Sequence, residues 1–72
     1  MYMLMVETIK TKIEGKTVWR RELGNQFKKI LSVQWDKLNL RVYIRDNCTD
    51  LEVDNLNNEP LEVTFTVTCL RL

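Results

Sequence analysis

The sequence contains no histidine and a single serine, Ser32. Without histidine, no side chain has an ordinary pKa close to neutrality, and Ser32 lies in an apolar stretch that offers no group to activate it. Cys48 stands between Asp46 and Asp50, whose negative charges raise the pKa of a thiol and so disfavour the reactive thiolate. These absences predict that the protein is not an enzyme and has no catalytic residues.

Metal-binding patterns are also missing. The two cysteines are not paired in the spacing of a zinc site. Asp50, Glu52 and Asp54 alternate as the first ligands of a calcium loop do, but Asn55 stands where that loop requires glycine and Leu61 where it requires a bidentate acid. A solvated acidic loop is therefore expected here, with no metal and no other cofactor.

Long hydrophobic runs are absent, since residues 2–6 are too short for the core of a signal peptide or for a membrane span, and this segment is expected to be an edge strand or a contact surface. We expect a cytoplasmic protein with no membrane contact. Residues 1–72 form one domain, and a lone core of that size contributes only about 3 to 5 kcal/mol. Two cysteines do not make the dense disulfide framework of small secreted domains, and no metal is expected. Subunit pairing is the remaining source of stability, so we expect a homo-oligomer, preferably a dimer, joined through a strand edge or an apolar sheet face.

Alanine is absent too, whereas valine, isoleucine and threonine fill 18 of the 72 positions, a composition that favours strands. The clearest strand covers residues 61–69, where apolar side chains alternate with polar ones. The predicted fold is mainly β, with five or six short antiparallel strands that form one curled sheet or a small barrel.

Two hairpins are expected within this fold. Residues 29–35 and 38–45 are separated by a short connection and predict one hairpin. The turn at Gly15 predicts a second, between the first segment of the chain and residues 17–21. Leu4 and Val6 have the opposite parity to Ile9 and Ile13, which in a strand implies a bulge or a change of face near Thr8.

Two other segments are ambiguous. Apolar residues in 20–31 fit a helical period, but Gly24 and the lack of an N-cap favour two strands joined by a loop, with one short helix as the alternative. Residues 46–58 are rich in asparagine and acids and predict a loop, to which Leu51 and Val53 could add a short strand.

Charge is distributed unevenly along the chain. Up to Arg45 there are ten basic and four acidic residues, and after it six acidic residues and one basic residue. This asymmetry indicates a polyanion-binding face opposite an acidic loop, complementary patches on neighbouring subunits, or two ordinary solvated faces. The candidate acidic loop consists of Asp46, Asp50, Glu52 and Asp54.

The second candidate site is the outward face of the predicted central hairpin. Arg41, Tyr43 and Arg45 alternate on one strand, and Lys29 and Trp35 are expected opposite them. Cations interleaved with aromatic rings suit single-stranded nucleic acid, because bases stack on rings while cations neutralise phosphates. The alternative is a cation–π cluster on a solvated sheet.

The run Ile30-Leu31-Ser32-Val33-Gln34, followed by the apolar strand at 38–44 and the closing strand at 61–70, resembles small β-rich proteins of unknown function encoded by bacteriophages and prophages. The resemblance covers about half of the chain, and this sequence lacks the glycine-rich ending usual in that family. It implies a phage or mobile-element setting, in which short non-enzymatic proteins often bind a host protein.

Together these features predict a non-catalytic interaction module that self-associates and binds a host macromolecule. One alternative is a small β-barrel that binds single-stranded nucleic acid through the basic and aromatic face. A further alternative is a structural component of a virion.

Overall fold

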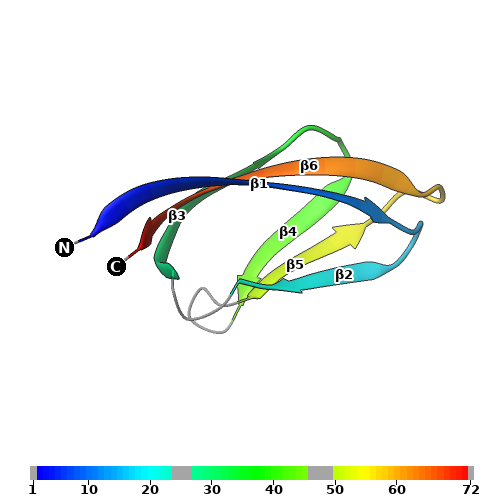
Figure 1. The fold of residues 1–72 in the computed structure, drawn as a ribbon. Helices are drawn as coiled ribbons and strands as arrows, with labels where there is room; N and C mark the ends of the chain where they lie inside the picture. Colours follow the sequence, from blue (N-terminus) through cyan, green and yellow to red (C-terminus); the bar gives the residue numbers. More distant parts are fainter. Residues whose placement is uncertain (1, 24–26, 46–49, 72) are drawn as a thin grey trace.

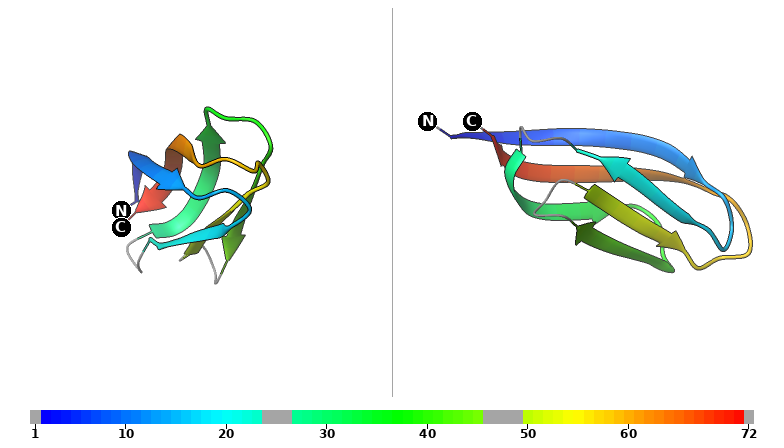
Figure 2. Two further views of the ribbon diagram at one scale, coloured as in Figure 1. Left: turned by 90° about the vertical axis from the view of Figure 1, so that its right-hand side faces the viewer. Right: turned by 90° about the horizontal axis from the view of Figure 1, so that it is seen from below.

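The computed structural model describes residues 2–23, 27–45 and 50–71, which form six antiparallel strands in two three-stranded sheets. Sheet A has the order β1 (Met3–Ile13), β6 (Leu61–Arg71) and β3 (Phe27–Trp35). Sheet B has the order β2 (Val18–Glu22), β5 (Asp50–Asn55) and β4 (Leu40–Arg45). The predicted mainly β fold is confirmed, as two curled layers packed face to face that do not close into a barrel (Figure 1, Figure 2).

The described residues contain no helix, and hence none long and apolar enough to cross a membrane. Within the ambiguous segment 20–31, residues 20–22 complete β2 and residues 27–31 begin β3. The described parts of this segment are therefore extended, as the two-strand interpretation predicts. The loop expected at Gly24 and Asn25 lies outside the described residues.

Three connections at the end of the molecule away from the termini cross from one layer to the other (Figure 1). They are residues 14–17, 36–39 and 56–60, and we call them the arches. Because of the arches, β1 and β2 lie in different sheets, and so do β3 and β4. Both predicted hairpins are therefore wrong. A hairpin turn and an arch both leave the apolar side chains of two successive strands facing one core. The alternation of apolar residues therefore does not show which of the two connections joins the strands.

Close backbone packing joins the arches to one another. The amide of Lys16 donates to the carbonyl of Asn57 at 3.0 Å, and the amide of Leu56 donates to the carbonyl of Asn39 at 3.1 Å. A Cβ atom at Gly15 would lie 2.2 Å from the carbonyl oxygen of Asn58, which explains the glycine at this position. The middle arch in space, residues 56–60, is thus held between the other two.

The core lies between the central strands of the two sheets. On β6 the residues from Val63 to Cys69 alternate between buried and half-buried, as the sequence predicts. Phe65 is fully buried and stacks across the layers on Trp19, with ring centroids 5.7 Å apart and an interplanar angle of 8°. The prediction that Cys69 is a small buried hydrophobe is also confirmed.

Residues 50–55 form the central strand of sheet B rather than a loop. Leu51 and Val53 point into the core and are fully buried. The short strand left open at Leu51 and Val53 is therefore confirmed, and the acidic loop is wrong for Asp50, Glu52 and Asp54, because the apolar residues between them anchor the strand.

Strand β1 runs from Met3 to Ile13 with an unbroken register against β6. The bulge or change of face expected near Thr8 is absent. Ile9 and Ile13 point into the core, while Leu4 and Val6 lie on the outer face of sheet A with 65% and 63% of their surfaces exposed. The change of parity in the sequence thus marks apolar residues on the outside of the sheet.

Candidate functional site

The outer face of sheet B brings the two predicted candidate sites together. Arg41, Tyr43 and Arg45 project outward from β4, and the acids of β5 stand in the neighbouring row. Arg41 lies directly opposite Asp54, and Tyr43 lies directly opposite Glu52. Cations that the sequence analysis assigned to one site therefore face anions assigned to another.

Glu52 is the centre of this face and is paired on both sides. Its Oε1 accepts a hydrogen bond from Arg20 Nε of β2 at 2.9 Å and lies 2.8 Å from an Nη of the same side chain. Its Oε2 accepts from Arg45 at 3.3 Å and 3.1 Å. The two guanidinium groups cover the carboxylate, so that Glu52 is only 8% exposed although it points away from the core.

Tyr43 takes part in the cation–π cluster that the sequence analysis gave as the alternative to a nucleic-acid site. The guanidinium carbon of Arg45 lies 4.8 Å from the centre of the Tyr43 ring. Arg45 therefore covers one side of the ring while it also binds Glu52. A base could stack on that side only by displacing the guanidinium.

Acids outnumber basic residues among the described side chains of this outer face. Three arginines stand beside four acids in the paired rows: Arg20, Arg41, Arg45, Glu22, Asp50, Glu52 and Asp54. Arg20 and Arg45 are ion-paired with Glu52, and arginines paired in this way release few counterions from a phosphate backbone and so contribute little to nucleic-acid affinity. The outer face of sheet B is an ion-paired surface rather than a cationic one.

The other predicted members of the candidate sites lie elsewhere. Lys29 and Trp35 belong to β3 in sheet A, so the structure does not place them opposite Arg41, Tyr43 or Arg45. The reason is that the connection after β3 is an arch and not a hairpin turn. Asp46 lies outside the described residues.

The two arginines hold the pKa of the Glu52 carboxyl below its ordinary value of 4.5, with the hydrogen bond from Arg20 as the largest cause and that from Arg45 next. A carboxyl whose pKa is lower in the folded state stabilises the fold above pH 4.5, and this stabilisation is lost as the pH falls toward the folded-state pKa. We expect Glu52→Gln to lower the urea midpoint at pH 7 and to lower it much less at pH 2. Urea unfolding of both proteins at the two pH values measures this. An equal difference at both pH values would show that the charge of Glu52 has no such role.

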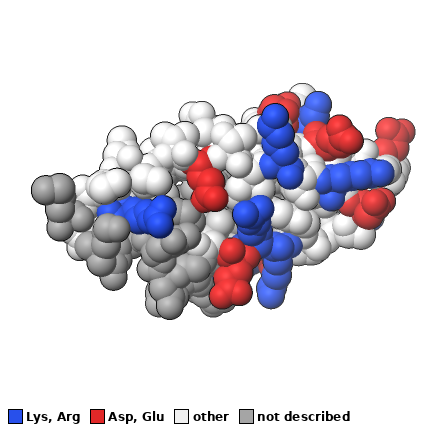
Figure 3. Space-filling model, in the orientation of Figure 1, with Lys and Arg blue, Asp and Glu red and all other residues white. Residues whose placement is uncertain are grey.

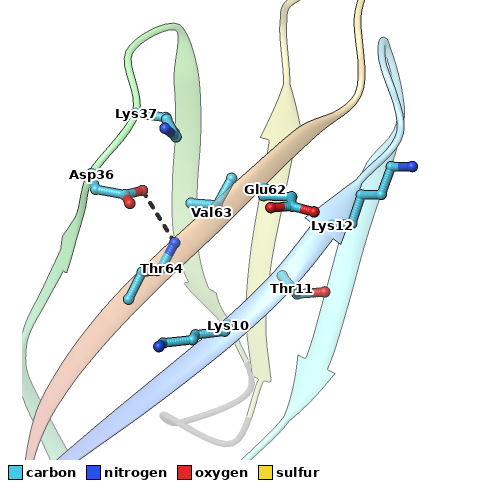
Figure 4. A pocket seen from close by; sticks show the side chains of 8 residues that line it. All are labelled: Lys10, Thr11, Lys12, Asp36, Lys37, Glu62, Val63 and Thr64. Atoms are coloured by element: carbon cyan, nitrogen blue, oxygen red, sulfur yellow. Dashed lines mark hydrogen bonds between the residues drawn. The ribbon is translucent and has the colours of Figure 1, made fainter.

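A groove of about 460 Å³ lies near the arches on sheet A, lined by Lys10, Lys12 and Lys37 among others. Figure 4 shows that these three side chains point apart rather than toward a common centre. The Asp36 carboxylate in the groove accepts a hydrogen bond from the amide of Thr64 at 3.1 Å, at the point where β3 leaves the edge of β6 (Figure 4). Asp36 thus completes the ladder of β6, and the groove offers no converging set of ligands.

Chemistry-bearing groups are few among the described residues. They include no group of three side chains that could hold a metal ion. Burial is the main cause that raises the pKa of the Cys69 thiol above 9.0, and Glu7 adds to the effect. Cys69 therefore remains a protonated thiol at neutral pH. Cys48 lies outside the described residues.

The start of the chain forms an edge strand, as expected, and carries an apolar surface on the outer face of sheet A, near the termini. We call this surface the terminal patch, and it consists of Tyr2, Leu4, Val6 and Leu70. Leu4 lies directly opposite Leu70 on β6, so that their side chains share one face. On the face shown in Figure 3, most charged side chains lie over the other half of the molecule. The opposite parity of Leu4 and Ile9 was the signal that places Leu4 on the outer face.

The chain was compared with protein families, with curated proteins and with solved structures. No family, no curated protein and no solved structure matches it.

Proposed function

We propose that this protein is a non-catalytic interaction module that self-associates through the free edge of β1 and the adjoining terminal patch. Self-association leaves the ion-paired outer face of sheet B open to a macromolecular partner. The single observation that carries the proposal is an unprotected stretch of strand edge at residues 3–6.

Strand edges normally carry features that prevent pairing with another chain, such as charges, bulges or short length. The edge of β3 is broken by two bulges, and its straight part, residues 32–35, presents Ser32 and Gln34 on the outer face. The edge strands of sheet B are short and bear arginines on β2 and β4. The second half of β1 carries Lys10 and Lys12.

Residues 3–6 have none of these features. Their sequence is Met-Leu-Met-Val, it contains no charge and no proline, and the register against β6 has no bulge there. Of the strand edges in the described residues, this is the only one that has a regular register, no charged side chain and apolar side chains on the outer face. An edge of this kind is a template for addition of a strand.

The small size of the domain supports the same proposal. A chain of 72 residues buries a smaller share of its surface than a larger domain does, and pairing of subunits adds buried apolar area. Contiguous apolar surface on a small protein is typical of an interaction site. The phage or mobile-element setting stays a prediction from the sequence.

Sedimentation equilibrium between about 5 µM and about 500 µM tests the proposal. We expect a monomer–dimer equilibrium for the natural protein. Leu4→Lys should raise the dissociation constant at least about tenfold, because it places a charge on the paired edge. Leu38→Lys is the matched control, since Leu38 is 86% exposed in an arch far from this edge, and should leave the equilibrium unchanged.

Three outcomes would count against the proposal. The first is a natural protein that stays monomeric over the whole range. The second is an equal effect of Leu4→Lys and Leu38→Lys. The third is a closed ring of many subunits, which would favour the virion component instead.

A further inference from the structure

We propose that the partner at the β1 edge is a second copy whose β1 pairs antiparallel with the first about a two-fold axis at Met5. The two copies then share one continuous sheet of six strands, in the order β3, β6, β1 and the same three in reverse. This inference rests on the proposed self-association and adds to it the register of the two strands.

Symmetry restricts the registers that are possible. A two-fold axis that relates two antiparallel strands of one sheet stands perpendicular to that sheet. It keeps the outer face of each copy on the same side, so residues of equal parity stand opposite one another. The axis therefore passes midway between the two copies of one residue of β1, and each choice of that residue defines one register.

An axis at Met5 gives matching neighbours on the outer face. Leu4 of each copy lies opposite Val6 of the other, so that four exposed apolar side chains cover one another. Tyr2 lies opposite Thr8 at either end of the paired segment. Apolar and aromatic cross-strand pairs of this kind stabilise a sheet.

Registers displaced toward the second half of β1 bring charges into poor positions. An axis at Glu7 places the two Glu7 carboxylates opposite one another and sets Leu4 against Lys10. Like charges that stand directly opposite each other destabilise a strand pair. An axis at Ile9 sets Val6 against Lys12. Each of these registers leaves the apolar side chains without apolar partners.

Registers closer to Met5 are less favourable for other reasons. An axis at Val6 sets Leu4 against Thr8 and Tyr2 against Lys10, so that only Val6 meets an apolar partner. With an axis at Leu4, only residues 2–6 have a partner in the other copy, so the paired segment is short. The axis at Met5 is the choice that pairs seven residues, 2–8, and sets both Leu4 and Val6 against apolar partners. It also leaves Lys10 and Lys12 beyond the paired segment, where they keep the rest of the edge free.

Disulfide trapping tests the register. The background, which is the starting protein for these variants, must carry Cys48→Ser and Cys69→Ala, so that it has no natural cysteine. Cys69 lies directly opposite Met5 within one chain and would form a disulfide with a new cysteine there. In this background an axis at Met5 places the Cβ atoms of Met5→Cys about 5 Å apart across the axis, close to the separation that a disulfide needs. Mild oxidation should yield a covalent dimer.

Glu7→Cys in the same background is the matched control. It lies on the same face of β1, but an axis at Met5 separates its two copies by four residues, or about 13 Å. We expect at least about tenfold more covalent dimer from Met5→Cys than from Glu7→Cys. A mixture of Met3→Cys and Glu7→Cys chains should give a mixed disulfide, because these residues stand opposite one another in this register.

The outcomes separate the register from the proposed function. A background protein that sediments as a dimer, yet links through Glu7→Cys and not through Met5→Cys, overturns the register while self-association stands. A natural protein that is monomeric overturns both. If the cysteine variants fail to fold, the register can be tested on the natural protein instead. Isotope-filtered nuclear Overhauser effects in a mixture of labelled and unlabelled protein then detect contacts between different chains. Contacts between the Leu4 and Val6 methyl groups of different chains are expected, and a dimer without them contradicts the register.

Discussion

Phe65→Ala is expected to leave the protein largely unfolded at 25 °C. Phe65 is fully buried in the middle of β6, the central strand of sheet A, and its ring stacks on Trp19 of the other layer. Truncation of a buried phenylalanine to alanine costs about 3 to 5 kcal/mol, because transfer free energy is lost and a cavity remains. A single core in a domain of this length contributes a similar amount in total.

Circular dichroism and urea unfolding measure this effect. Leu38→Ala is the control, because Leu38 projects into solvent from an arch, and a change there should stay within about 0.5 kcal/mol. A Phe65→Ala protein that unfolds cooperatively with nearly the stability of the natural chain would show that the contact between the layers is not the main source of stability.

Asn55→Ala is expected to lower the free energy of unfolding by about 3 kcal/mol. Asn55 ends β5 and points into the core, where it is 1% exposed. Its amide group donates to the carbonyl oxygens of Ile13 at 3.1 Å, Glu14 at 3.3 Å and Glu59 at 3.0 Å. The side chain thus ties two arches together. Its removal takes this donor from the carbonyls of Ile13 and Glu59, while the Glu14 carbonyl keeps its hydrogen bond from Thr17 Oγ1 at 2.7 Å.

Asn57→Ala is the control for Asn55→Ala. It shows whether the loss of stability comes from the contacts of Asn55 with the arches or from the loss of any side-chain amide in this region. The Asn57 side chain donates to Asn55 Oδ1 at 3.0 Å from a more exposed position, so its removal should cost about 1 kcal/mol. Urea unfolding of both variants gives the comparison. Equal and small losses for the two variants would mean that the arches do not depend on Asn55.

The strands could be predicted from the sequence more reliably than their connections. Alternation from Val63 to Cys69 identified the inner face of β6, because a period of two has only one simple structural meaning. The same alternation fits a hairpin and an arch equally well, and the arches depend on the close approach at Gly15 and on the contacts of Asn55. Those contacts join residues far apart in the chain, and no local pattern announces them.

The candidate sites could be predicted only in part. Arg41, Tyr43 and Arg45 do share an outward face, as their spacing predicts. The pairing of Arg45 with Glu52 was not foreseen, because residues 46–58 were expected to form a loop with at most a short strand at Leu51 and Val53, and not the strand next to β4. Side chains across a sheet are paired by topology, which the spacing within one strand does not reveal.

Leu4 gives the opposite lesson. Its parity conflicts with that of Ile9, and the conflict was explained by a bulge or a change of face near Thr8, because apolar residues are expected to face the core. The structure keeps the strand regular and leaves Leu4 outside. A break in the hydrophobic pattern can therefore indicate an interaction surface as well as an irregular strand.

The most direct test of association through the β1 edge is a dilution series followed by amide resonances of the natural protein. We predict that the resonances that shift with concentration belong to residues 2–8, together with their neighbours on β6. Shifts confined to the edge of β3 at residues 31–35, or to the outer face of sheet B at Arg41, Tyr43 and Arg45, would contradict the account.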